Sequence, residues 1–66
     1  MTALEIQKTF NSTFAGYNKR GGIINKARAS KMYSLYTRMN EARKAEGIAP
    51  LILPSLESRF RQYSIA

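Results

Sequence analysis

The sequence predicts an all-α fold, a small three-helix domain in which a helical hairpin with a long central basic helix is followed by an extended segment and a short C-terminal helix. Residues 23–46 are the longest run without Gly or Pro and are rich in good helix formers. The segments before and after this run carry apolar residues at spacings of three and four. Helix start and stop signals flank the expected helices.

The central helix is expected over residues 23–46. It ends at Gly47, the residue type favoured just past a helix, and Pro50 follows three positions later. At about 100° per residue, one face is apolar and carries Ile24, Met32, Leu35, Met39 and Ala42. The opposite face carries Lys26, Tyr33 and Lys44, and Lys31 and Arg38 lie along one edge. The sequence therefore predicts an amphipathic helix with a cationic outer face.

The first helix is expected over residues 3–16. Thr2 and Glu5 match the capping box, in which each side chain accepts a hydrogen bond from the other residue's backbone N–H. Gly16 is expected to stop the helix. Residues 18–22 combine two cations with a glycine pair and are expected to form the hairpin loop. An apolar stripe should face the core: Ala3, Ile6, Phe10, Phe14 and Tyr17.

Residues 48–54 are apolar, but the residue before each of the two prolines is pushed toward extended geometry. We expect this strap to lie over the hairpin, and docking into a partner's groove is the alternative. A third helix should cover residues 55–64, with Ser55 as its N-cap and Arg59 and Arg61 pointing outward. The predicted core consists of Ile6, Phe10, Phe14, Met32, Leu35, Met39, Leu53 and Phe60.

The 66 residues are expected to form a single small helical domain, residues 1–66. The chain contains no Cys or His, so disulfides and zinc cannot reinforce the small core. Homo-oligomerisation, which would bury leftover apolar surface, is left open. The N-terminal residues do not resemble a secretory signal, and the lack of Cys fits a reducing compartment. These observations favour a cytoplasmic location.

The residue inventory argues against enzymatic function. Besides having no His or Cys, the chain has no Asp, and its four acidic residues are all Glu. General acid–base and nucleophilic catalysis therefore have almost no candidate groups. Glu41 and Glu46 are five positions apart and do not share a helical face, so no carboxylate metal site is expected. The sequence predicts a protein with no enzymatic activity, cofactor or metal.

Charge is the main indication of function. The net charge is +7, and eight of the eleven basic residues lie between residues 19 and 44, where Glu41 is the only acid. Such clustering is typical of nucleic-acid-binding proteins. No base-reading motif is present, so backbone contact with weak sequence preference is expected. The predicted binding residues are Lys19, Arg20, Lys26, Arg28, Lys31, Tyr33, Arg38, Arg43 and Lys44.

A protein-binding adaptor, inhibitor or assembly component is the alternative function. Its cations would meet an acidic partner, and its Met and Tyr side chains would fill the partner's pockets. However, the spacing of Met32 and Met39 with Leu35 favours a core position for both methionines, and Tyr36 also lies close to the apolar face. A basic face that serves only solubility, and a helix that lies on anionic lipid, are the remaining interpretations.

Overall fold

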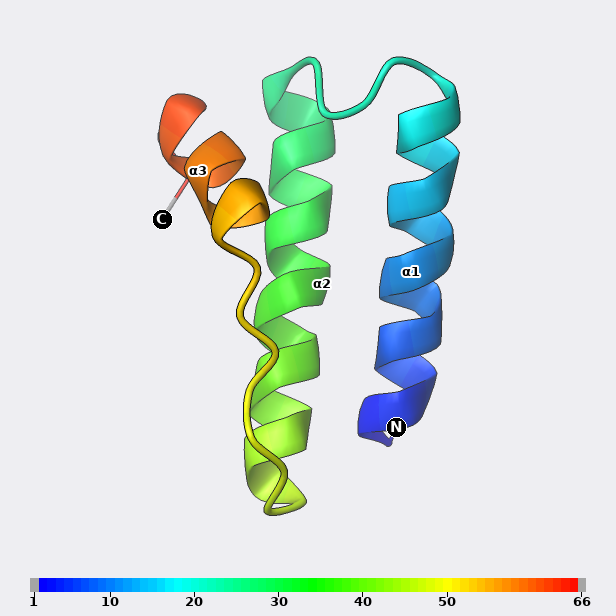
Figure 1. The fold of residues 1–66 in the computed structure, drawn as a ribbon, viewed down its shortest axis with the longest axis vertical. Helices are drawn as coiled ribbons and strands as arrows, with labels where there is room; N and C mark the ends of the chain where they lie inside the picture. The colour runs from blue at the N-terminus through cyan, green and yellow to red at the C-terminus, as the bar shows by residue number, and fades with distance from the viewer. Residues whose placement is uncertain (1, 66) are drawn as a thin grey trace.

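A computed structural model describes residues 2–65, and within this range the chain forms three α-helices. Helix α1 spans Ala3–Lys19, α2 spans Lys26–Ala45 and α3 spans Pro54–Gln62. Helices α1 and α2 form an antiparallel hairpin, and α3 packs on the other side of α2 (Figure 1). The predicted all-α class is therefore confirmed.

The start of α1 is fixed by two sets of hydrogen bonds. The capping box is present, because the Thr2 hydroxyl accepts from the Glu5 N–H at 3.3 Å and the Glu5 carboxylate accepts from the Thr2 N–H at 3.2 Å. The Glu46 carboxylate, at the end of α2, accepts from the Ala3 N–H at 2.6 Å. This second contact joins the start of α1 to the end of α2.

Helix α1 continues past Gly16, so the predicted stop at that residue was wrong. A glycine within a helix lowers its stability but does not end it unless the backbone also reverses. The reversal occurs at Gly21 and Gly22, with φ values of +97° and +87°. The Gly22 N–H donates to the Tyr17 carbonyl at 2.7 Å. The connector therefore spans residues 20–25 rather than 18–22.

Helix α2 starts later than expected and ends as expected. Asn25 is its N-cap, and the Asn25 side chain accepts from the Arg28 N–H at 2.9 Å. Ile24 consequently lies outside the helix and is 56% exposed, which corrects its placement on the apolar face. At the other end Gly47 has φ +75°, and the Ile48 N–H donates to a carbonyl of the last turn at 2.8 Å. This is the Schellman ending that Gly47 predicted.

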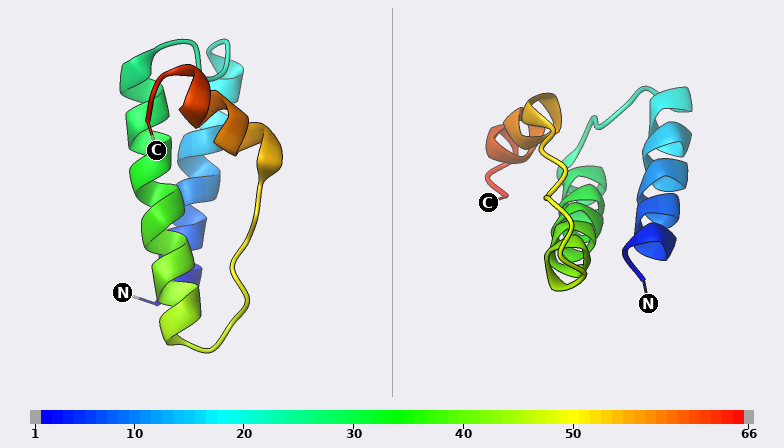
Figure 2. Two further views of the ribbon diagram at one scale, coloured as in Figure 1. Left: turned by 90° about the vertical axis from the view of Figure 1, so that its left-hand side faces the viewer. Right: turned by 60° about the horizontal axis from the view of Figure 1, so that its bottom comes forward.

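The strap, helix-free over residues 48–53, runs back alongside α2 to α3 (Figure 2). Side chains of α2 hold it by hydrogen bonds. The Asn40 amide both donates to the Leu51 carbonyl and accepts from its N–H, at 3.1 and 2.9 Å. The Tyr36 hydroxyl accepts from the Leu53 N–H at 3.1 Å. The backbone of the strap is thus paired at Leu51 and Leu53 even though it belongs to no helix or sheet.

Helix α3 begins at Pro54, with Leu53 as N-cap and no side-chain cap. The predicted N-cap, Ser55, lies inside the helix instead. Proline is well suited to the first helical position, because its fixed φ is already helical and its missing N–H would have no intrahelical partner there. The helix ends at Gln62, with Tyr63 as C-cap. The backbone reverses at Ser64, which has φ +59°, and the Ile65 N–H donates to the Phe60 carbonyl at 2.8 Å.

The core lies on both sides of α2. Five predicted core residues are buried, whereas Ile6, Phe14 and Leu53 are half-buried and pack at its margin. Helices α1 and α3 both pack on α2, and their backbones do not pack closely against each other. The buried apolar side chains are Ala3, Phe10, Ile23, Ala29, Met32, Leu35, Tyr36, Met39, Leu56 and Phe60.

Truncating Phe10, which is 2% exposed, should remove the main α1 contribution to this core. We expect Phe10→Ala to lower the free energy of unfolding by about 3 to 5 kcal/mol, a large part of the stability of so small a domain. Urea or thermal unfolding measures the change. Leu4→Ala is the control, because Leu4 is 62% exposed on the same helix. An unaltered melt of Phe10→Ala would remove Phe10 from the core.

The capping box should also make stability depend on pH. Hydrogen bonds from Thr2, chiefly from its backbone N–H and then from its hydroxyl, lower the pKa of Glu5 from its ordinary value of 4.5. Because the folded pKa lies below the unfolded one, this contribution is present above the unfolded pKa and is lost as the pH falls through the folded pKa. Glu5→Gln should therefore show a shallower loss of urea midpoint on acidification than wild type. Parallel profiles for the two proteins would contradict this.

Candidate nucleic-acid interface

The hairpin has two ends that differ in charge. We call one the loop end: the last turn of α1, the connector 20–25, the first two turns of α2, and the C-terminal half of α3, which lies beside them (Figure 1). The far end comprises the rest of the hairpin and the start of the strap. Arg59 of α3 and Ile24 of the connector line the same pocket, so α3 reaches the loop end.

Within residues 2–65, the loop end carries no carboxylate side chain. Glu5 and Glu46 lie at the opposite extreme of the hairpin, and Glu41 lies near the end of α2. Glu57, in the first turn of α3, lines a groove with Glu41 and Lys44. The four basic residues outside the loop end equal these four glutamates in number, so the net side-chain charge of +7 lies toward the loop end. Arg61 is four positions from Glu57 on α3, and the two line one groove. Its seven cations are Lys19, Arg20, Lys26, Arg28, Lys31, Arg59 and Arg61.

The strap explains why α3 contributes to this end. Its six residues span at most about 20 Å when extended, whereas α2 is about 30 Å long. Helix α3 therefore starts near Tyr36, in the middle of α2, and continues toward the connector. Sequence reasoning identified Arg59 and Arg61 as outward-facing cations but did not include them in the binding site. Only the path of the strap brings them to the other cations.

Arg28 holds the connector in place by hydrogen bonds. Its Nη1 donates to the carbonyls of Arg20 and Gly22, at 2.9 and 2.8 Å. Its guanidinium also lies 5.3 Å from the centre of the Tyr17 ring, and that of Arg20 lies 5.7 Å from the same ring, both within cation–π range. The structure therefore gives Arg28 a structural role in addition to its charge.

Two other predicted binding residues are also engaged in packing. Arg43 is half-buried, and its guanidinium donates to the Gln7 side chain at 3.1 Å and to the Ala49 carbonyl at 2.8 Å. Arg43 thus links α1, α2 and the strap at the far end. Tyr33 is half-buried, with its ring centre 5.2 Å from that of Phe60 in an edge-to-face contact. Helix α3 therefore covers part of the α2 face that was expected to be open and cationic.

The remaining predicted residues are exposed but do not form one patch. Lys19, Arg20, Lys26 and Lys31 lie together at the loop end. Arg38 and Lys44 lie in the second half of α2, and each is three positions from Glu41, which makes them neighbours of that carboxylate on the helix surface. The structure thus brings together one group of the predicted cations and places the others in mixed surroundings.

The loop end supplies positive charge and N–H donors, and its chemistry is that of anion binding. Within residues 2–65, no cluster of His, Cys, Asp or Glu could hold a metal ion. In the same range, no helix combines the length and the apolar character needed to cross a membrane. No protein-family model, curated protein or solved structure matches the chain.

Proposed function

We propose that this protein is a small, non-enzymatic nucleic-acid-binding protein that contacts the phosphate backbone with its loop end. The observation that supports this most directly is the location of the net charge of +7, which lies toward the loop end while the far end is balanced. Basic residues gathered on one part of a surface attract a polyanion, and each phosphate that is neutralised releases condensed counterions.

The exposed lysines and Arg20 would contact the phosphates. Lys19, Arg20, Lys26 and Lys31 come from two helix ends that Arg28 holds in place through the connector. The first backbone N–H groups of α2 lack intrahelical partners, and the positive end of the helix dipole adds to the same field. Such contacts position a nucleic acid but do not read its bases, so weak sequence preference is expected.

Docking on a partner protein is the second candidate function. Leu4, Ile48 and Ile52, which are 42 to 62% exposed, lie toward the far end and would suit an apolar contact. In that case the cations would complement one acidic patch rather than a polymer. A co-purifying acidic protein would favour this function, whereas co-purifying nucleic acid would favour the first.

Binding to duplex DNA should weaken steeply with salt. If about four phosphates are contacted, log K should fall against log salt with a slope near −4. Lys19→Gln should reduce the steepness of this slope by roughly one, because it removes one cation of the loop end. Lys8→Gln is the matched control, since Lys8 is also exposed on α1 but lies in its N-terminal half. Fluorescence anisotropy titrations at several salt concentrations measure these slopes.

Two results would count against the proposal. Equal slopes for Lys19→Gln and Lys8→Gln would show that charge acts without regard to position, so the loop end would not be the interface. Absence of binding to duplex DNA, single-stranded DNA and RNA at up to about 100 μM protein, near 150 mM salt, would reject nucleic-acid binding and favour the protein-partner function.

A further inference from the structure

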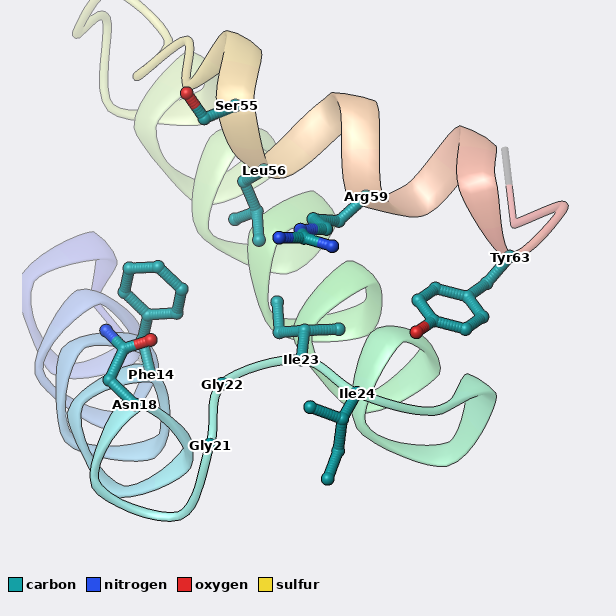
Figure 3. A pocket seen from close by; sticks show the side chains of 10 residues that line it. All are labelled: Phe14, Asn18, Gly21, Gly22, Ile23, Ile24, Ser55, Leu56, Arg59 and Tyr63. Carbon is teal, nitrogen blue, oxygen red and sulfur yellow. The ribbon is translucent and has the colours of Figure 1, made fainter.

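A slot opens at the loop end between α1 and α3 (Figure 3). It exists because both helices pack on α2 while their backbones stay apart from each other, and the connector closes its floor. Its volume is about 360 Å³, which is at the small end of the roughly 300 to 1,000 Å³ typical of ligand sites. A single flat ring system fits such a space better than a peptide helix or strand.

The slot has apolar inner surfaces and a polar rim. Phe14, Ile23 and Leu56 provide apolar surface from α1, the connector and α3. The Phe14 ring is held by a stacked contact with Phe10, with ring centres 6.1 Å apart, and Tyr63 adds a second aromatic ring. Such rings are the usual stacking partners of unpaired bases in proteins that bind single strands.

Polar groups at the rim are available to a ligand. Asn18 on α1 and Ser55 on α3 are exposed, and within residues 2–65 no side-chain hydrogen bond engages either one. Arg59 projects from α3 toward the connector (Figure 3), and its Nη1 donates to the exposed Gln62 side chain at 3.3 Å. A nucleobase combines apolar faces with a polar edge, and its attached phosphate is anionic. The rim therefore offers hydrogen bonds for the base edge and a cation for the phosphate.

We propose that this slot receives one unpaired nucleobase of a single-stranded nucleic acid, while the flanking phosphates lie on the surrounding cations. This inference rests on the proposed function and adds a preference to it. A paired base cannot enter the slot, so single strands should bind more tightly than a duplex of the same length. Charge complementarity favours this occupant over a neutral apolar ligand, because the slot lies within the end of the molecule that carries the net positive charge.

The first test compares two probes with the same phosphates. A fluorescein-labelled ten-residue thymidine oligonucleotide and its counterpart with abasic sites at all internal positions are titrated with the protein at fixed salt. Base stacking should make the thymidine oligonucleotide bind on the order of 10-fold to 100-fold more tightly. Equal affinity for the two probes would overturn the slot but leave backbone binding intact. Absence of binding to either probe or to duplex DNA would overturn both proposals.

Two matched pairs of variants locate the base. Ser55→Phe fills the slot from an exposed position on α3, whereas Ser58→Phe places the same ring at an exposed position that does not line it. Ser55→Phe should abolish the preference for thymidine over abasic probe, and Ser58→Phe should keep it. Thermal melts establish that both variants fold.

The second pair changes charge equally at two places on α3. Arg59→Gln and Arg61→Gln each remove one exposed cation of the loop end, but only Arg59 lines the slot. Both should weaken binding to every probe. Arg59→Gln should in addition reduce the ratio of thymidine to abasic affinity by several-fold, and Arg61→Gln should preserve it. Identical ratios in Arg59→Gln, Arg61→Gln and wild type would place the base elsewhere and overturn the assignment.

Discussion

Tyr36 is the side chain on which the three helices converge. Its ring centre lies 6.2 Å from that of Phe10 in α1 and 5.6 Å from that of Phe60 in α3, and its hydroxyl accepts the Leu53 N–H just before α3 begins. One residue in the middle of α2 therefore sets where α1 packs, where the strap ends and where α3 starts. Because α3 starts there, its second half lies beside the connector and brings Arg59 to the other cations.

Two arginines have structural roles in this molecule, whereas the lysines are exposed to solvent. Arg28 and Arg43 each donate to two acceptors in segments that belong to no regular structure or to another helix. A guanidinium suits such positions because its planar fork presents several fixed donors. The lysines are all exposed, and their compact charge on a flexible stem suits contact with a phosphate. Arg28 thus holds the connector between the helix ends that carry Lys19 and Lys26, whereas Arg43 links the helices and the strap at the far end.

The seven cations at one end of the molecule lower the stability of the fold, because like charges repel. The hydrogen bonds of Arg28 and the Tyr17 ring beside two guanidinium groups offset part of this repulsion without adding negative charge. A carboxylate partner would have offset it more fully but would also have cancelled the field. The loop end therefore keeps its charge, and a bound polyanion would relieve the remaining repulsion.

Local hydrogen bonding and helical periodicity decide several features, which could therefore be predicted from the amino-acid sequence: the all-α class, the capping box at Thr2, the Schellman ending at Gly47 and the burial of Met32 and Met39. One local pattern led to a wrong prediction. Gly16 is a residue type that often ends a helix, but α1 continues past it and the backbone reverses at Gly21 and Gly22. The predicted cationic face followed from an isolated helix with one open side. Which cations lie together depends instead on long-range packing, because the strap places α3 over part of α2 and so brings Arg59 to cations that are far away in the sequence.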